Sequence, residues 1–514
     1  MTVEANGNVG AEGNGEVSEP HAPSLLDALA PIVVLVVLLA LTIVLFGIDA
    51  SGGPLQVALM ASGVFAGLVA LKNGHDPDRL RDAAVGGVSS AMGAIFILLA
   101  VGALIGTWNM AGTIPTVVSY GVAILKPGIF YAAVAVICAL VGAVTGSSWT
   151  TAGTLGVAFV GMAPVLGLST AIAAGAVISG AYVGDKMSPL SETTILVPTL
   201  VGGVSVSQHI RGMVVTVAPA FAIALLIYLV IGLTGTVDSD PASVDAARAS
   251  IADAFWISPL NLLPIAALVV LTLRKVPPYL TIFMVALGTG VLGCITQPDA
   301  VAAFVGGDHN GLRTSVEAVY TAMGTGFESS TGNATIDDLF SGGGMASMLS
   351  TVWLILAALS FAAIMEEAGF LERLIRPVVR RAKTEAGLIL SVVGTCLGLN
   401  IVAGDQYVAV VLPSRVFRVV FARRGLAPRM LSRTVEDTGT VTSPLVPWNS
   451  CGAYMAGVLG VSTITYLPYA FFNYLNPAVA VAYALTGFRI ERVPPAEIET
   501  TPHPLPTPGG APNV

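Results

Sequence analysis

Charged residues are scarce in this chain: Asp, Glu, Lys and Arg make up 11% of its 514 residues, against about a quarter in soluble proteins. Hydrophobic residues make up 54%, and the mean hydropathy is +0.83. Apolar runs of roughly 20 residues, the length that spans a bilayer, recur along the chain. This composition excludes a water-soluble globular protein and predicts an all-α polytopic membrane protein whose partner is the lipid bilayer.

Cysteine and histidine are also scarce. The four cysteines have no zinc-ligand or disulfide-framework spacing, and they are Cys138, Cys294, Cys396 and Cys451. The five histidines form no His-Glu-x-x-His motif, and we expect none in a span, with His75 and His209 in cytoplasmic loops. We therefore expect neither an enzyme nor a cofactor. The net charge is −8, and the charges are distributed by side rather than pooled in a basic patch of the kind that binds nucleic acid. This excludes nucleic acid as a partner.

About 10 transmembrane helices and two split apolar stretches are expected. The spans lie near 29–47, 55–71, 84–107, 170–200, 212–234, 257–273, 278–296, 346–368, 434–457 and 468–487. The split stretches, 129–167 and 385–417, are interrupted at Gly146 and Gly404. Their arms of about 15–17 residues are short for full spans. We therefore expect two re-entrant hairpins, with pairs of tilted crossings as the alternative.

Basic residues gather on one side of the expected spans. One group precedes the second split stretch: Arg373, Arg376, Arg380, Arg381 and Lys383. Another follows it: Arg418, Arg423, Arg424, Arg429 and Arg433. Only Lys126 flanks the first split stretch, so the two stretches are expected to enter from opposite sides. The positive-inside rule makes the basic side cytoplasmic and predicts a multi-pass protein of the cell membrane with both termini in the cytoplasm.

The two halves of the chain also resemble each other. Cys138, Gly146 and Phe159 recur at one constant offset as Cys396, Gly404 and Phe417, and Ser188-Pro-Leu190 recurs nearly in register as Ser443-Pro-Leu445. Together with the charge distribution, this indicates an inverted-topology repeat of about five elements per half. Such a repeat supports alternating access.

The remaining boundaries follow from composition. Residues 1–24 are polar and Gly-rich without a basic n-region, so they are expected to be a disordered tail and not a signal peptide. The Pro-rich residues 491–514 form a second expected tail. Between the tails we expect a first transmembrane helix (25–53), repeat A (54–235), a linker loop and connecting helix (236–277), and repeat B (278–490) with an external loop at 297–345.

Two expected helices are broken by polar residues, which a membrane tolerates only where protein or a wet cavity covers the backbone. The first break contains Asp185, Ser188 and Glu192. An acid at a span centre costs about 2.5–3.5 kcal/mol on insertion scales, so its presence needs a reason. The oxygen atoms of this break suit a hard cation such as Na⁺. Alternatively, Asp185 pairs with Lys186 and only holds the break, and Glu192 either pairs with Lys186 or joins the site.

The second break runs from residue 436 to residue 449. Glu436, Asp437 and Thr438 are candidate ligands or proton-coupling groups, and Asn449 is a candidate neutral ligand. The alternative for both acids is a solvated salt bridge with Arg433 near the cytoplasmic end of the span.

The expected hairpin tips carry further candidates. Asp405 lies at the second tip, where free carbonyl and amide groups of two helical arms converge. Its alternative role is to cap the following arm. Ser147 and Thr150 lie at the first tip, where they either supply oxygen ligands or only cap. Asp185, Asp405 and Asp437 are the expected Na⁺ ligands.

The excess of intramembrane acids over bases predicts cation/proton exchange. Burial raises a carboxylate pKa and a bound cation lowers it, so one site holds Na⁺ or H⁺ but not both. This competition is sufficient for antiport.

At these residues the chain resembles the NhaC-type Na⁺/H⁺ antiporters of the ion transporter superfamily. The resemblance is carried by Gly112-Thr-Ile-Pro-Thr116, Thr145-Gly-Ser-Ser-Trp149, Gly153-Thr-Leu-Gly-Val157, Gly180-Ala-Tyr-Val-Gly-Asp-Lys-Met-Ser-Pro-Leu-Ser-Glu-Thr-Thr194 and Ser443-Pro-Leu-Val-Pro-Trp-Asn449. It implies inverted repeats with re-entrant hairpins, and exchange of cytoplasmic Na⁺ for external H⁺. Glu192 stands where Asp is more usual in the family.

A carrier that moves a small carboxylate such as malate or lactate with Na⁺ or H⁺ is the alternative function, because it would use the same breaks. Such a carrier needs a cation or a helix N-terminus for its anion, and Lys186 or a hairpin tip could serve. The sequence leaves open whether Li⁺ is accepted and whether the protein is a homodimer.

Overall fold

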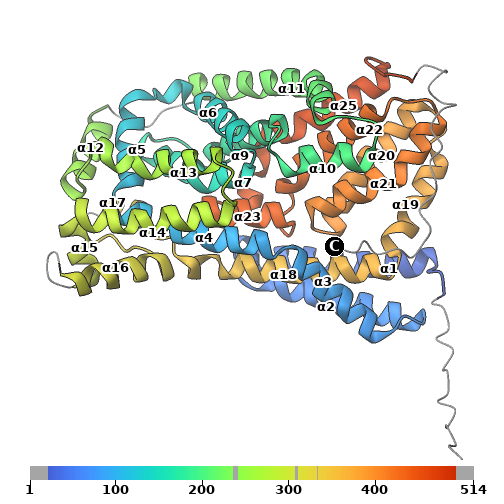
Figure 1. The fold of residues 1–514 in the computed structure, drawn as a ribbon, viewed down its shortest axis with the longest axis horizontal. Coiled ribbons are helices and arrows are strands. Elements are labelled where there is room, and N and C mark those ends of the chain that lie inside the picture. Colours follow the sequence, from blue (N-terminus) through green and yellow to red (C-terminus); the bar gives the residue numbers. More distant parts are fainter. Residues whose placement is uncertain (1–20, 236–240, 307–310, 333, 494–514) are drawn as a thin grey trace, which may run out of the picture.

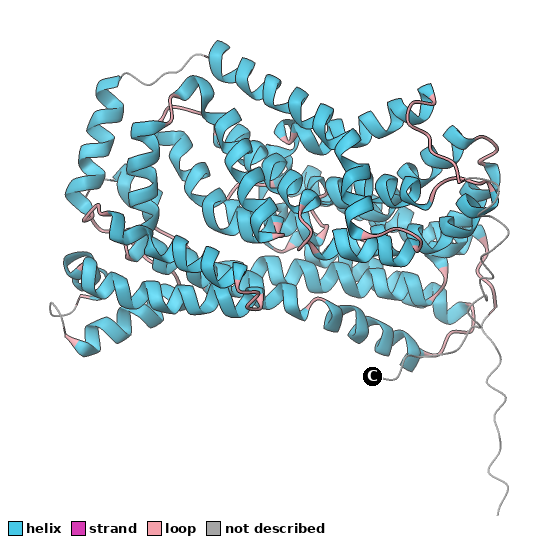
Figure 2. Cartoon of the chain, turned by 45° about the horizontal axis from the view of Figure 1, so that its top comes forward, coloured by secondary structure: helices cyan, strands magenta, loops and turns pink. Residues whose placement is uncertain are grey.

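The computed structural model describes residues 21–235, 241–306, 311–332 and 334–493, and this part of the chain is helical (Figure 2). Within these residues, eight helices are long and apolar enough to cross a membrane, or up to 10 if each of two pairs bent by 90° counts as one span. Large apolar side chains remain exposed on such helices, for example Val44 and Ile295, as expected of surfaces that face lipid. The predicted all-α polytopic membrane fold is confirmed.

The first half of the chain runs from α1 to α11. Its elements are α1 Leu25–Phe46, η1 Gly47–Gly52, α2 Pro54–Lys72, α3 Pro77–Ser90, α4 Met92–Met110, α5 Thr113–Ile124, η2 Pro127–Ile129, α6 Phe130–Thr145, α7 Ser148–Thr151, the π-helical turn η3 Ala152–Gly156, α8 Val157–Val165, α9 Thr170–Met187, α10 Glu192–Val201 and α11 Val206–Thr234.

The connecting segment and the second half run from α12 to α25. Their elements are α12 Pro241–Ala254, η4 Pro259–Leu262, α13 Leu263–Leu273, α14 Pro278–Thr296, α15 Pro298–Val305, α16 Leu312–Gly324, α17 Ala334–Phe340, η5 Met345–Met348, α18 Leu349–Glu367, α19 Phe370–Arg381, α20 Glu385–Val402, α21 Gln406–Arg423, α22 Pro428–Val435, the π-helical turn η6 Glu436–Thr440, η7 Ser443–Leu445, α23 Ser450–Leu459, α24 Thr463–Tyr466, η8 Leu467–Tyr469 and α25 Phe471–Thr486.

Several predicted boundaries change in the structure. The single span predicted at 84–107 is two helices, α3 and α4, separated at Ala91. The span predicted at 257–273 becomes helical only from η4 onward, and the external loop predicted at 297–345 contains three helices, α15, α16 and α17. The tails predicted at 1–24 and 491–514 fall largely outside the described residues, as does the start of the predicted linker at 236–240.

The two halves share one order of elements. In each half a long helix is followed by a left-handed glycine and a short helix: α4, Gly112 and α5 in one, α18, Gly369 and α19 in the other. A hairpin follows, turning at Gly146 or Gly404, and then a broken helix. The long helix of each half packs on a helix of the other half: α4 packs on α14, and α18 packs on α2.

The hairpins and broken helices occupy the interior of the molecule. Figure 1 shows α9, α10 and α23 between α11 on one side and α18 on the other. Helices α6 and α9 pack most closely at glycines: a Cβ on Gly180 would lie 2.1 Å from the Ala135 carbonyl oxygen, and one on Gly184 would lie 2.3 Å from that of Ala139. Small residues let membrane helices approach this closely, and here they hold the end of α9 in place.

Candidate functional site

The first broken helix consists of α9 and α10. Helix α9 ends at Met187 because Pro189 disfavours helical backbone at the residue before it, and Ser188 is extended, with φ −86° and ψ 131°. Ser191 then caps α10, so residues 188–191 are unwound. The tip of the first hairpin lies on this unwound segment, since a Cβ on Gly146 would be 2.8 Å from the Leu190 carbonyl carbon.

The second broken helix consists of α22, η6, η7 and α23. The π-helical turn η6 carries Glu436 and Asp437, and such turns occur frequently at functional sites. The helix ends near Ser443, and α23 begins at Ser450 with Asn449 as its cap. The acids therefore lie inside the protein, with both side chains fully buried.

Lys186 and Asp437 form an ion pair between the two broken helices. Both side chains have 0% exposure. The same Asp437 oxygen, Oδ1, also accepts hydrogen bonds from Thr216 Oγ1 at 2.9 Å and from Asn476 Nδ2 at 3.1 Å. Lys186 thus pairs with Asp437 and not with Asp185, which was one expected alternative. The other alternative, a solvated salt bridge between Arg433 and the acids, does not describe Asp437, whose side chain is fully buried against Lys186.

Glu436 has fewer partners than Asp437. Its Oε1 accepts a hydrogen bond from Thr193 Oγ1 at 2.8 Å, and Thr193 lies 3.3 Å from Ser191 Oγ. Four buried oxygens of this turn have no hydrogen-bond partner among the described residues, and they are Glu436 Oε2, Asp437 Oδ2, Thr438 Oγ1 and Thr440 Oγ1. Buried polar atoms are normally satisfied. Free carboxylate and hydroxyl oxygens are ligands that hard cations prefer.

Asp185 and Asp405 connect each hairpin tip to the broken helix of its own half. Asp185 Oδ2 accepts hydrogen bonds from the backbone N–H of Ser148 at 3.0 Å and from its hydroxyl at 2.7 Å. Asp405 caps α21 through the Val408 N–H at 3.0 Å and accepts from Ser450 Oγ at 3.2 Å. The acid lies on the broken helix in one half and on the tip in the other, with the hydroxyl opposite.

The other predicted site residues have defined partners. Ser147 caps α7 and accepts from the N–H and hydroxyl of Thr150, both at 3.1 Å. Ser188 Oγ accepts from the Leu190 N–H at 3.2 Å. Glu192 is exposed and accepts a hydrogen bond from Tyr407, not from Lys186.

Asn449 connects the second break to the hairpin beside it. Its Oδ1 accepts from the Cys451 N–H at 3.0 Å, and its Nδ2 donates to Asn400 Oδ1 at 3.1 Å. Asn400 in turn donates to the Gly439 carbonyl in the π-helical turn at 2.7 Å. The amide of Asn449 is therefore fully engaged in structural contacts.

Among the described residues, no three His, Cys, Asp or Glu side chains come together as a metal cluster. The predicted Na⁺ ligands accordingly have separate surroundings: Asp185 is held by Ser148, Asp405 by Ser450 and Asp437 by Lys186.

Sequence reasoning missed Thr216 and Asn476 as partners of the buried acids. Asn473 and Asn476 lie in an otherwise apolar span, and that polarity was the available signal. The placement of His209 in a loop was wrong. Ser205 caps α11, so the helix begins before His209, whose ring is fully buried with Nδ1 3.0 Å from Ser432 Oγ.

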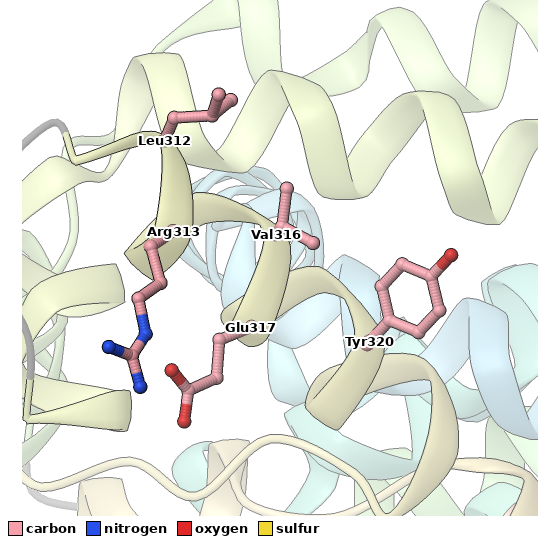
Figure 3. A pocket seen from close by; sticks show the side chains of 5 residues that line it. All are labelled: Leu312, Arg313, Val316, Glu317 and Tyr320. Atoms are coloured by element: carbon pink, nitrogen blue, oxygen red, sulfur yellow. The ribbon is translucent and has the colours of Figure 1, made fainter.

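A surface hollow over α16 lies apart from these residues. Figure 3 shows the charged ends of Arg313 and Glu317 together on one side of the helix, with Leu312, Val316 and Tyr320 on the other. Leu312 and Tyr320 are mostly exposed, and Figure 1 places α16 and α22 at opposite ends of the molecule. This hollow is not part of the buried cluster.

Comparisons with known proteins agree on one family. The model of the Na⁺/H⁺ antiporter family matches residues 14–205 and 199–488. The Na⁺/H⁺ antiporter NhaC of Alkalihalophilus pseudofirmus is 36% identical over 85% of this chain and 90% of that protein. The arginine/ornithine antiporter ArcD of Halobacterium salinarum is 35% identical, covering 92% and 94%. The malate-2H⁺/Na⁺-lactate antiporter of Bacillus subtilis is 33% identical, covering 84% and 90%.

Proposed function

Since this chain belongs to the Na⁺/H⁺ antiporter family, which confirms the resemblance of its motifs, we propose that it exchanges cytoplasmic Na⁺ for external H⁺ by alternating access. The observation that carries this proposal is the fully buried acid pair Glu436 and Asp437 on the π-helical turn. Buried acids in a membrane protein are expensive and mark ion and proton pathways.

The charges of the buried cluster support cation/proton exchange. Four carboxylates, those of Asp185, Asp405, Glu436 and Asp437, are at most 8% exposed. Lys186 neutralises one of them. The others need protons or a cation to remain buried, because an uncompensated charge is costly in such surroundings. Loading Na⁺ and releasing H⁺ at one carboxylate is the exchange that the function requires.

The position of the cluster suits alternating access. Contacts that cross between the halves here include Lys186 with Asp437, Thr193 with Glu436, and Trp149 stacked on Tyr454 at 4.0 Å. The shared order of elements in the two halves supports an inverted-topology repeat. The site would then lie where the two repeats meet. Rocking one repeat against the other would then expose the site to each side in turn.

The orientation proposed from the basic residues places both termini in the cytoplasm of a cell-membrane protein. It is tested by single cysteines introduced at Lys126 and Lys383, both exposed, in a variant lacking the native cysteines. An impermeant maleimide added to intact cells should label the first and not the second. The reverse labelling would invert the topology.

Exchange of a small carboxylate is the second candidate, because relatives include the malate/lactate and arginine/ornithine antiporters. A substrate carboxylate would need a cation or a helix N-terminus, and the cation expected for it, the ammonium of Lys186, is already bound by Asp437. The geometry therefore favours cation exchange.

The experiment uses everted vesicles or proteoliposomes with an acid interior and a pH-sensitive dye. Additions are NaCl, LiCl, KCl, and then sodium malate, lactate or arginine. Na⁺/H⁺ antiport predicts that NaCl alone dissipates the gradient and that Glu436→Gln does not respond. A response that requires an organic substrate on either side would transfer the assignment to an organic-acid or amino-acid exchanger.

A further inference from the structure

The two adjacent acids of the π-helical turn differ in their surroundings, and this difference assigns them different roles. We propose that Glu436 is the carboxylate that exchanges Na⁺ for H⁺, in a site lined by the hydroxyls of Thr193, Ser191 and Thr440. Asp437 instead remains the fixed counter-ion of Lys186. The inference rests on the proposed antiport function and names its site.

Asp437 is held through one of its two carboxylate oxygens, while Oδ2 has no hydrogen-bond partner among the described residues. Its Oδ1 receives the Lys186 ammonium, the Thr216 hydroxyl and the Asn476 amide. Asn476 also binds the Asp437 backbone carbonyl at 3.0 Å. The Lys186 ammonium already balances the charge of this carboxylate, so Asp437 has less need of a second cation than a buried carboxylate without an ion pair.

Glu436 has no ammonium bonded to it. The Thr193 hydroxyl donates to Oε1, the Thr440 hydroxyl lies near the same carboxylate, and Oε2 is buried without a close hydrogen-bond partner among the described residues. Thr440, four positions further along the same turn, has a buried hydroxyl that is likewise unpartnered within the described chain. Glu436 Oε2 and Thr440 Oγ1 are two of the four such oxygens on this turn, and they belong to a carboxylate without an ammonium and to a hydroxyl beside it, which provides the opening for a cation.

Thr193 is suited to respond to the occupant of this site. A hydroxyl has one hydrogen to donate and two lone pairs to accept. Its oxygen lies 2.8 Å from Glu436 Oε1 and 3.3 Å from Ser191 Oγ. With the site empty, the hydrogen points to the carboxylate. With Na⁺ bound, the hydrogen turns to Ser191, and the lone pairs of Thr193 face the cation.

The ligands come from both halves of the chain. Thr193 and Ser191 belong to the first broken helix, and Glu436 and Thr440 to the second. A movement that separates these helices would therefore remove hydroxyl ligands from the carboxylate and release the cation. This geometry couples the occupancy of the site to the relative position of the halves.

The test measures proton release from purified protein in weakly buffered detergent on addition of NaCl or LiCl. Wild-type protein should release protons with saturating dependence on Na⁺. Glu436→Gln should release none. The neutral pair Lys186→Gln/Asp437→Asn should bind Na⁺ more weakly but still release protons. Release from Glu436→Gln would overturn the proposal, and loss of release in the double variant while Glu436→Gln still releases protons would assign the exchange to Asp437.

A second set of variants tests the hydroxyl ligands without removing a charge. Thr193→Val should raise the Na⁺ concentration for half-maximal release about tenfold, the loss expected from one ligand, and Thr193→Ser should restore it. Thr199→Val is the matched control, because Thr199 lies on the same helix, is exposed and bonds only its own helix at Ile195. Equal effects of Thr193→Val and Thr199→Val would exclude Thr193 as a ligand.

If wild-type protein releases no protons with NaCl or LiCl but transports an organic substrate, the proposed function is wrong. If wild-type protein responds to Na⁺ and Glu436→Gln responds equally, the function stands and the assignment of Glu436 is wrong.

Discussion

The ammonium of Lys186 and the carboxylate of Asp437 form a fully buried ion pair that joins the broken helices of the two halves. The pair is embedded in neutral donors, because Thr216 and Asn476 bind the same carboxylate oxygen. Burying two charges costs desolvation energy that only such geometry offsets. Because Asp437 is adjacent to Glu436 in the sequence, the pair is a fixed neighbour of the proposed exchange site.

Removing one member of this pair should destabilise the protein strongly. Lys186→Met leaves the Asp437 carboxylate buried without a cation, which costs about 3–5 kcal/mol. We expect a large fall in the thermal unfolding midpoint of the detergent-solubilised protein, together with loss of transport. An unfolding midpoint equal to that of wild type would mean that the pair contributes little to the fold.

Removing both members is the control for that change. Lys186→Met/Asp437→Leu should recover most of the lost stability, because replacing a buried pair by apolar residues of similar volume is often neutral. The double-mutant cycle of unfolding midpoints isolates the coupling between the two residues. Additive losses would show that Lys186 and Asp437 stabilise the protein independently.

The first hairpin tip should tolerate no side chain at Gly146. This residue has a φ of 69°, and an added Cβ would lie 3.0 Å from the Ser191 backbone nitrogen. Gly146→Ala therefore adds a clash with the unwound break to a backbone penalty of about 1–2 kcal/mol, and it should shift both stability and the Na⁺ dependence of transport.

Gly460 is the matched control for Gly146. It also ends a helix with left-handed backbone, at φ 66°, but an added Cβ would meet nothing within 4 Å. Gly460→Ala should lower the thermal midpoint by the backbone penalty alone and leave transport near normal. Equal losses of transport in the two variants would contradict a specific role for the tip.

Glu192 should matter less for the ion than Glu436. Its carboxylate is exposed and is bound by the Tyr407 hydroxyl, which connects α10 to the second hairpin. Contacts at exposed positions are worth about 0–1 kcal/mol. Glu192→Gln and Tyr407→Phe should therefore change stability little and shift Na⁺ half-saturation far less than Glu436→Gln in vesicle assays. Complete loss of transport in Glu192→Gln would place this residue in the ion path.

Asn449 should affect stability more than ion selectivity. Truncation to alanine removes the cap of α23, worth about 0.5–2 kcal/mol, and leaves the side-chain oxygen of buried Asn400 without the donor from Asn449. We expect a lower unfolding midpoint with an unchanged preference among Na⁺, Li⁺ and K⁺. Ser462→Ala, which removes the cap of α24, is the comparison. A changed ion preference in Asn449→Ala alone would make Asn449 a ligand.

Much of the fold could be predicted from the sequence because a bilayer imposes simple rules. Apolar runs of spanning length must be helical, which predicted the class of fold. Gly146, Gly404, Pro189 and Pro444 act on local backbone, so both hairpin turns and both breaks could be placed from residue type. The acids stood out for the same reason, since charge is rare in such segments.

The partners of those acids were decided only by the tertiary structure. Lys186 is adjacent in sequence to Asp185 but pairs with Asp437, and Glu436 meets Thr193 from the other half of the chain. His209 moved from an expected loop to a buried ring because α22 covers the start of α11. A sequence therefore identifies which residues are costly to bury, but hydrogen bonds and ion pairs act over a few ångströms, so only the packing of distant helices determines which partners offset that cost.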